Sequence, residues 1–134
     1  LNQMQISWIR ITLNRQWLEV MEADRAVAAY PMSSARRGAG ERYGSEQTPR
    51  GRHEVRELIG QDALPGTVFV ARRPTGEIWS RDAAARQPER DWILSRIIWL
   101  GGLEAGRNCG GDVDTYTRYI YIHGTPETEP IGEP

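Results

Sequence analysis

The chain has 134 residues, of which 39% are hydrophobic and 26% are charged, and its formal net charge is −1. This length suits one domain and is too short for two independent cores, so we expect a single domain over residues 1–134. The small net charge gives no reason to expect a nucleic acid or an anionic membrane as a partner, and no apolar run approaches the roughly 20 residues of a transmembrane segment. The glycine and proline content (14 and 8 residues) is typical of a β-rich domain with many turns.

Residues 5–32 are predicted to form a meander of three short strands. Two short turns divide this segment at the regular spacing that successive antiparallel strands produce. The expected strands are 5–13, 16–22 and 25–32, with turns at Asn14-Arg15 and Ala23-Asp24. The alternative is a helix over 16–29, because "LEVMEADRAVAA" is rich in helix-forming residues. Propensity alone favours the strands only slightly.

Residues 33–52 have no apolar periodicity and contain several glycines, which predicts a long loop. Loops of this length are uncommon in compact domains and often line a functional site. The elements expected after it are strands over 53–60 and 66–73, a turn and short strand in 74–80, a helical segment within 81–91 that Pro88 limits, and a strand over 92–100 that is apolar on both faces.

The last predicted strand, 116–123, alternates in character along its length. Thr117, Tyr119, Tyr121 and His123 are expected to share one face, whereas Arg118, Ile120 and Ile122 take the other. His123 therefore ends a strand just before Gly124, where solvent and a ligand can reach it.

An accessible histidine in this position is a candidate general base, because the unperturbed pKa of imidazole lies near neutrality. The alternative is a hydrogen-bonded structural histidine, the commoner role when a single histidine is considered by itself. Cys109 is a second candidate for chemistry, as a nucleophile, but it lies in a glycine-rich loop with no other supporting feature.

No metal or organic cofactor is expected. A metal site needs three or four ligands, and the available candidates have no recognised spacing: His53, Cys109, His123 and the pair Asp112 and Asp114. The glycines of "RRGAGERYGS" match no phosphate-binding motif. Glutamates interleaved among the arginines of the same loop weaken the case for nucleic-acid binding.

Two stretches of the sequence resemble the L,D-transpeptidase (YkuD-type) catalytic domain. "SSARRGAGERYGSEQTPRGRHEV" is similar to the family segment that leads through a glycine-containing loop to a "TP-x-G" turn. "GDVDTYTRYIYIHGT" is similar to the segment that delivers the active-site histidine at a strand end. The two occur in the family's order and at about its separation, and the resemblance spans roughly residues 20–134.

The resemblance implies a mainly β, sandwich-like fold of mixed sheets with a short helix. It also implies cell-wall chemistry, in which a cysteine thiolate attacks an amide of a peptidoglycan stem peptide to form a thioester. His123 would be the catalytic base, and Tyr121, Gly124 and Thr125 would bind substrate. The loop carrying Thr48, Pro49 and Gly51 is then expected to lie near His123.

The family's nucleophilic cysteine follows the histidine by about 14–18 residues in a Ser/Thr-x-Gly-Cys-x-Arg motif, so Cys109, which precedes His123, does not match it. From the resemblance we expect that motif and the final elements of the fold beyond Pro134, and no activity from these 134 residues alone. The implied partners are stem peptides and, for a complete domain, carbapenem inhibitors. The implied location is the periplasm or cell envelope. The alternative is a degenerate, non-catalytic domain that binds envelope peptides.

Overall fold

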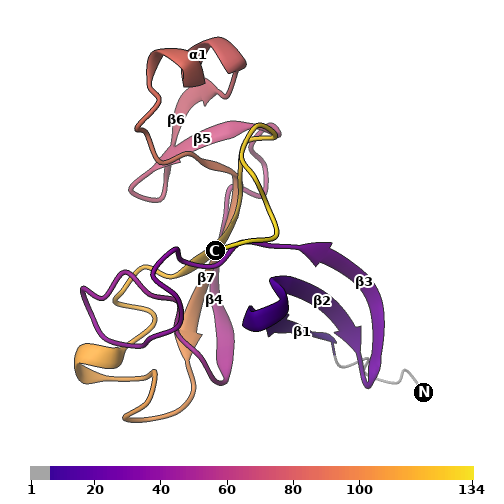
Figure 1. Ribbon diagram of the computed structural model, residues 1–134, viewed down its shortest axis with the longest axis vertical. Coiled ribbons are helices and arrows are strands. Elements are labelled where there is room, and N and C mark those ends of the chain that lie inside the picture. Colours follow the sequence, from indigo (N-terminus) through magenta and orange to yellow (C-terminus); the bar gives the residue numbers. More distant parts are fainter. Residues whose placement is uncertain (1–6) are drawn as a thin grey trace.

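The computed structural model describes residues 7–134 and is mainly β, with two antiparallel sheets and one short helix (Figure 1). The mainly β class expected from the sequence is confirmed. Among the described residues, every pairing between named strands is antiparallel.

The first sheet is the predicted meander, in the order β1-β2-β3. It consists of β1 (Ser7–Thr12), the 3₁₀ turn η1 (Leu13–Arg15), β2 (Trp17–Glu22) and β3 (Arg25–Pro31). Gln16 and Ala23, which precede and follow β2, have positive φ angles of 51° and 53°. These reversals place the chain in hairpins, so the strand interpretation of residues 16–29 is confirmed over the helical one. Residues 5 and 6 of the first predicted strand lie outside the described residues.

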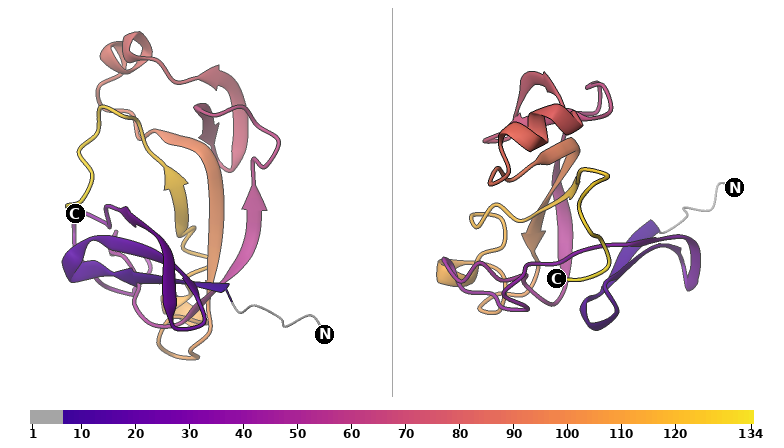
Figure 2. Two further views of the ribbon diagram at one scale, coloured as in Figure 1. Left: turned by 90° about the vertical axis from the view of Figure 1, so that its right-hand side faces the viewer. Right: turned by 45° about the horizontal axis from the view of Figure 1, so that its top comes forward.

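The second sheet is organised around one long strand, β7 (Ile93–Gly102). Ile97 pairs with Ile59 of β4 (His53–Ile59) on one edge and with His123 of β8 (Tyr121–Gly124) on the other. Leu94 likewise pairs with Val68 of β5 (Thr67–Val70) and, on the edge of β8, with Gly124. β4 and β5 therefore lie end to end along one edge of β7, and β8 occupies the other edge (Figure 2).

A hairpin replaces the single strand predicted over 66–73. Val70 pairs with Arg73, so Ala71 and Arg72 form a two-residue turn that leads into β6 (Arg73–Ile78). Both turn residues have positive φ, the conformation that closes a tight hairpin in register with the twist of its strands. The prediction missed this turn because neither residue is one of the types that usually mark it. After β6, α1 (Arg81–Arg86) is shorter than the predicted segment and begins at Ser80, whose side chain accepts a hydrogen bond from the backbone N–H of Ala83.

The core lies on both faces of β7, as its sequence predicted. One cluster contains Phe69, Ile97 and Trp99, and the other contains Val68, Trp92 and Leu94. Because Val68 and Phe69 are adjacent in β5, their side chains point to opposite faces of the sheet. Burial of these six side chains fixes β5 and β7 as the centre of the structure.

The last predicted strand is wrong over residues 116–120: residues 116–119 form turns, and β8 begins only at Tyr121. Asp114 explains the difference, since its carboxylate accepts hydrogen bonds from the backbone N–H groups of Gly110 and Thr117. Its carbonyl also accepts from the N–H of Arg118. An aspartate that binds the backbone two or three residues away favours a turn over a strand.

Candidate active site

A bulge in β7 determines the position of the predicted catalytic histidine. Leu94 pairs with Gly124 and Ile97 with His123, so Ser95 and Arg96 are extra residues on β7 with no counterpart on β8. Ser95 has a φ of 68°, and its hydroxyl accepts a hydrogen bond from the N–H of Gly66. Bulges bend a strand and re-aim the neighbouring side chains. This bulge lies directly beside His123.

His123 lies near the end of β8 with an exposed side chain, as the sequence predicted. Its Nδ1 atom is 2.7 Å from the carbonyl oxygen of Gly124. A carbonyl can only accept, so Nδ1 carries a hydrogen in this arrangement, and in the neutral ring the lone pair is then on Nε2. Within residues 7–134, no hydrogen bond engages Nε2. The ring is thus oriented by one nitrogen and leaves the other free to take a proton.

Tyr121 shares its face of the sheet with His123 and belongs to a cluster of aromatic side chains. Trp99 stacks on Tyr116 with centroids 4.2 Å apart, meets Tyr121 edge-on at 5.7 Å, and lies 5.8 Å from Tyr119. Tyr121 also accepts a hydrogen bond of 3.2 Å from Arg72 of the β5–β6 hairpin. The sequence did not single out Arg72, because the predicted strand ran through the turn that presents it.

Gly124 and Thr125 continue from His123 at the end of β8. A Cβ atom on Gly124 would lie 2.7 Å from the carbonyl oxygen of Leu94, so the close approach of β8 to β7 requires glycine here. Close packing is thus a reason for glycine at this position that is separate from the substrate-binding role expected from the resemblance. Thr125 is exposed.

The loop 33–52 is attached to the segment between β7 and β8. The Arg118 guanidinium donates to the carbonyl oxygens of Gly40 and Gln47 and to the hydroxyl of Ser45, over distances of 2.7–3.3 Å. Its partial burial lowers the pKa of Arg118. Arg118 was expected to lie on the opposite strand face from His123, and instead it holds the loop in place.

The "TP-x-G" part of this loop makes its described hydrogen bonds away from His123. The Thr48 hydroxyl accepts from the N–H of Ala35, and the Gly51 carbonyl accepts from His53. Among the described residues, no hydrogen bond joins Thr48, Pro49 or Gly51 to His123.

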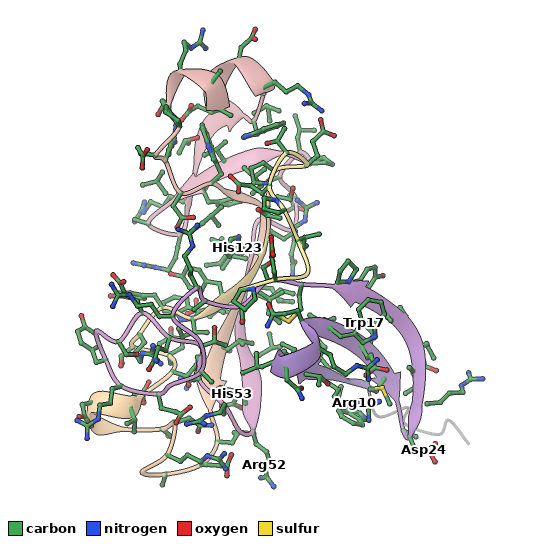
Figure 3. All side chains as sticks on the ribbon, in the orientation of Figure 1. Arg10, Trp17, Asp24, Arg52, His53 and His123 are labelled. Atoms are coloured by element: carbon green, nitrogen blue, oxygen red, sulfur yellow. The ribbon has the colours of Figure 1, made fainter. Side chains whose placement is uncertain are left out.

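His53 lies at the other end of β7, opposite Gly102 (Figure 3). Its Nδ1 donates to the Gly51 carbonyl oxygen at 3.0 Å, and its Nε2 lies 2.8 Å from the hydroxyl of Thr115, a fully buried residue. Burial lowers the pKa of His53, which favours the neutral ring. Both ring nitrogens are engaged in hydrogen bonds, so His53 has a structural role.

Cys109 and His123 lie beside different parts of β7. The neighbouring residue Asn108 is fully buried, and its side-chain amide donates to the carbonyl oxygens of Arg50 and Arg52. Its backbone packs so closely that a Cβ on Gly102 would lie 2.0 Å from the Asn108 carbonyl oxygen. Five residues of β7, about 17 Å of strand, separate Gly102 from the partner of His123, Ile97. The structure therefore does not bring this thiol to the histidine.

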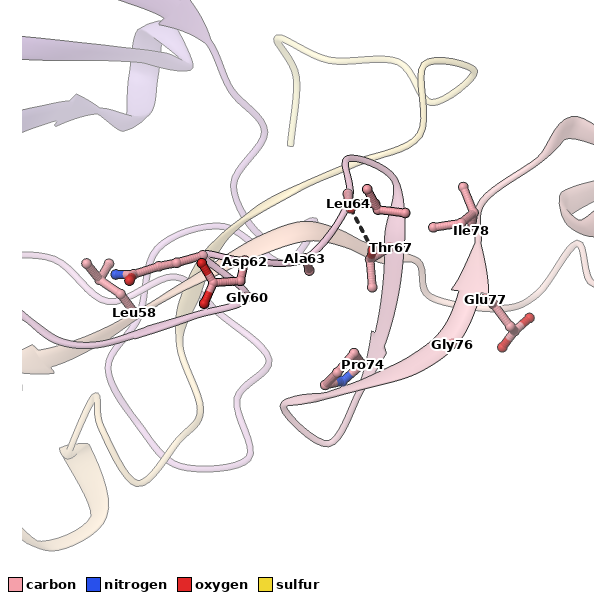
Figure 4. A pocket seen from close by; sticks show the side chains of 11 residues that line it. Leu58, Gly60, Asp62, Ala63, Leu64, Thr67, Pro74, Gly76, Glu77 and Ile78 are labelled. Atoms are coloured by element: carbon pink, nitrogen blue, oxygen red, sulfur yellow. Dashed lines mark hydrogen bonds between the residues drawn. The ribbon is translucent and has the colours of Figure 1, made fainter.

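A surface hollow of about 630 Å³ lies where β4 ends and β5 has not yet begun (Figure 4). Its walls are formed by the turn over residues 60–64 and by β6, and the turn is closed by a 2.6 Å hydrogen bond from the Thr67 hydroxyl to the Leu64 carbonyl oxygen. Neither His123 nor Tyr121 lines this hollow.

No group of three or more histidine, cysteine, aspartate or glutamate side chains gathers as a metal site within residues 7–134. Nor does any helix in this part of the chain have the length and apolar character needed to cross a membrane.

Comparison with known families gives one result that covers nearly the whole chain. A family model of the YkuD type, the L,D-transpeptidase catalytic domain, matches residues 6–134. Comparisons with curated proteins and with solved structures gave no significant match. The matched region includes both sheets and the strand that carries His123, and on this basis the chain belongs to the YkuD family of L,D-transpeptidase catalytic domains.

Proposed function

We propose that this chain carries the histidine of an acyl-transfer site that acts on peptidoglycan stem peptides. The family supplies the reaction class and the cell-wall substrate. The observation that favours His123 is its hydrogen bonding beside the β7 bulge: Nδ1–H is bound by the Gly124 carbonyl, and Nε2 has no described hydrogen-bond partner on this exposed residue. A base must present a lone pair to the proton that it removes, and this arrangement presents one.

In the proposed reaction, His123 Nε2 accepts the proton of a cysteine thiol. The thiolate attacks the amide carbonyl that precedes the terminal D-residue of a stem peptide. The carbon–nitrogen bond then breaks as the imidazolium returns its proton to the leaving amine, and an acyl-thioester remains. An amine of a neighbouring stem peptide, or water, attacks the thioester and regenerates the thiol.

The nucleophile in this proposal is the cysteine of the family's Ser/Thr-x-Gly-Cys-x-Arg motif, which follows the histidine in sequence. Cys109 is the sole cysteine among the 134 residues, and it precedes His123. The attachment of Asn108 at the Gly102 end of β7 argues against a pairing of Cys109 with His123. We therefore propose that these 134 residues are inactive without that motif.

Tyr121, Gly124 and Thr125 are proposed to contact the substrate. Tyr121 lies two positions before His123 on the same face of β8, and Thr125 follows directly where the strand ends. A peptide lying along this edge would meet all three. Because peptidoglycan lies outside the cytoplasmic membrane, we place the protein in the periplasm or cell envelope.

A second candidate function is peptide binding without catalysis. It is favoured by the same separation of Cys109 from His123, because a domain without the cysteine motif would keep Tyr121, Gly124 and Thr125, which are proposed to contact the peptide, but would lack the nucleophile. The presence of the motif therefore distinguishes the two functions.

Intact-mass spectrometry after carbapenem treatment tests the proposal. We expect no adduct on the 134-residue chain, and a single adduct when the chain also carries the family's cysteine motif downstream of His123. An adduct on the 134-residue chain that maps to Cys109 would show that the proposed nucleophile is wrong. A longer chain with the motif intact that forms no adduct would favour the binding function.

A further inference from the structure

Among the described residues, Arg10, Arg56 and Arg90 each lie over one aromatic ring, whereas Arg72 lies over two. Seven arginines in the described part of the chain form ion pairs with carboxylates: Arg10, Arg37, Arg42, Arg50, Arg81, Arg90 and Arg107. Arg72 instead lies over two aromatic rings, 4.4 Å from the centroid of Tyr119 and 5.2 Å from that of Trp99. No ion pair joins it to a carboxylate within residues 7–134.

The hydrogen-bonding capacity of this guanidinium is largely unused. Arginine has five N–H donors, and the one side-chain bond described for Arg72 goes from Nη1 to the Tyr121 hydroxyl. The ionisable groups that raise the pKa of Arg72 are the hydroxyls of Tyr121, which accepts its hydrogen bond, and of Tyr119 and Tyr116, and no carboxylate is among them. The residue thus keeps a full positive charge and a planar set of donors with no anion opposite them.

Its position is fixed from two sides. Ala71 and Arg72 occupy the tight β5–β6 turn with φ angles of 48° and 65°, which limits the backbone. The aromatic cluster supports the other end of the side chain, since Trp99 is buried and its indole N–H donates to the Tyr116 carbonyl oxygen. A guanidinium held in this way loses little conformational freedom when it binds a ligand.

Tyr121 connects the Arg72 guanidinium to His123, because Tyr121 and His123 are close together on β8. Tyr121, which accepts the Arg72 hydrogen bond, precedes His123 by two residues on the same face of β8, a separation of about 6.8 Å along the strand. In the proposed substrate, the terminal carboxylate is one residue from the amide that is cleaved, at most about 3.6 Å of chain.

We propose that Arg72, with the Tyr121 hydroxyl, binds the terminal carboxylate of the acyl-donor peptide and so places the preceding amide at His123. The inference rests on the proposed function, because it assumes a peptide donor. Arginine binds carboxylates through two parallel hydrogen bonds, which fixes orientation as well as affinity. Arg72 is then a specificity-determining residue, which selects donors that end in a free carboxylate.

Calorimetric titration with two synthetic stem peptides tests this proposal, one ending in a free D-residue carboxylate and the other in its amide. The unmodified chain is expected to bind the acid roughly tenfold to a hundredfold more tightly than the amide, the range for a hydrogen bond to a charged group. Arg72→Gln is expected to bind both peptides with the affinity of the amide. Arg73→Gln removes the same charge from the same hairpin and is expected to keep the preference.

Other outcomes separate this inference from the proposed function. If Arg72→Gln retains the preference for the acid, the carboxylate binds elsewhere and the Arg72 inference is overturned, while peptide binding stands. If Arg73→Gln loses the preference equally, overall charge explains it and the assignment to Arg72 also fails. If the unmodified chain binds neither peptide, the proposed peptide site is itself overturned. Near-ultraviolet circular dichroism of the Trp99 cluster verifies that each variant is folded.

Discussion

Two histidines lie beside β7, His53 opposite its last residue, Gly102, and His123 opposite Ile97 near its middle, and their surroundings differ in almost every respect. At the Gly102 end, His53 is half-buried and both ring nitrogens have partners, the Gly51 carbonyl and the Thr115 hydroxyl. Opposite Ile97, His123 is exposed, and only Nδ1 has a described partner. A histidine with both ring nitrogens hydrogen-bonded stabilises a fold, whereas a histidine with one nitrogen free can exchange a proton with a ligand.

The backbone around the two residues differs in the same sense. Near His53 the chain segments are joined by buried side chains, above all Asn108, which binds residues that are more than 50 positions away. Near His123 the contact is between backbones, with the Ser95 bulge on one side and Gly124 on the other. Long-range hydrogen bonds of side chains therefore hold the structure around His53, whereas close backbone contacts hold it around His123.

Replacing each histidine by alanine should separate the two roles most strongly. In a chain that carries the cysteine motif, we expect His123→Ala to slow carbapenem acylation by about 10²–10⁴-fold, the usual contribution of a general base. Its free energy of unfolding should change by no more than about 0.5 kcal/mol, because the side chain is exposed. His53→Ala should cost about 1–3 kcal/mol of stability, because it leaves the buried Thr115 hydroxyl without its partner.

Intact-mass spectrometry measures the acylation rate of each variant, and urea titration measures its free energy of unfolding. A His53→Ala variant that loses acylation while fully folded, with His123→Ala unaffected, would reverse the roles assigned here.

Alanine at the two close-approach glycines should sharpen the comparison at the level of the backbone. A Cβ on Gly102 would meet the Asn108 carbonyl oxygen at 2.0 Å, and one on Gly124 would meet the Leu94 carbonyl oxygen at 2.7 Å. Both changes should destabilise the protein by about 1–3 kcal/mol, with Gly102→Ala the larger, because backbone atoms cannot easily move aside.

Urea titration of Gly102→Ala, Gly124→Ala and, as a control, the exposed Thr125→Ala measures this difference. Thr125→Ala should be nearly neutral. Equal, negligible effects at both glycines would mean that β7 and its neighbours are not as closely packed as described.

The smallest expected effect is a pH dependence that belongs to His53 alone. Burial lowers the pKa of His53 in the folded protein, so the unfolded chain binds a proton more readily. Stability is therefore retained above the ordinary histidine pKa of about 6.5 and declines as pH falls from there toward the lower folded-state pKa.

The midpoint of urea unfolding, measured between pH 7.5 and 5.5, should fall with pH in the unmodified chain. His53→Gln should remove this decline, and His123→Gln, which retains His53, should keep it. A decline that persists in His53→Gln would show that another group is responsible.

Sequence reasoning located strands from turn spacing and apolar composition, and a loop from its glycines. The meander over 5–32 was predicted from the regular spacing of its turns, and the strand over 92–100 from apolar residues on both of its faces. The resemblance to the YkuD family also pointed to His123, and the structure places it at a strand end, as expected. Such features depend on local sequence, which one chain is sufficient to reveal.

Three features were missed, two of them local turns and one a bulge that depends on a distant strand. The alternation of residues 116–120 suggested a strand, but Asp114 and the loop partners of Arg118 favour turns instead. The Ala71–Arg72 turn has no glycine or asparagine to mark it, so Arg72 was read as part of a strand. The bulge at Ser95 appears only once β8 is aligned against β7.

The attachment of the loop 33–52 by Arg118 has a consequence for the order in which the chain acquires its structure. Arg118 binds residues that precede it by 71 to 78 positions, whereas the hairpins of the first sheet connect residues that are close in sequence. Contacts between distant residues form later, because a long segment must first be brought together at a cost in entropy. During synthesis the meander can pair as soon as it emerges. The loop can be attached only after residues 53–118 have been made, which are about four-fifths of the residues that follow it here. The loop 33–52 is therefore among the last regions to become ordered.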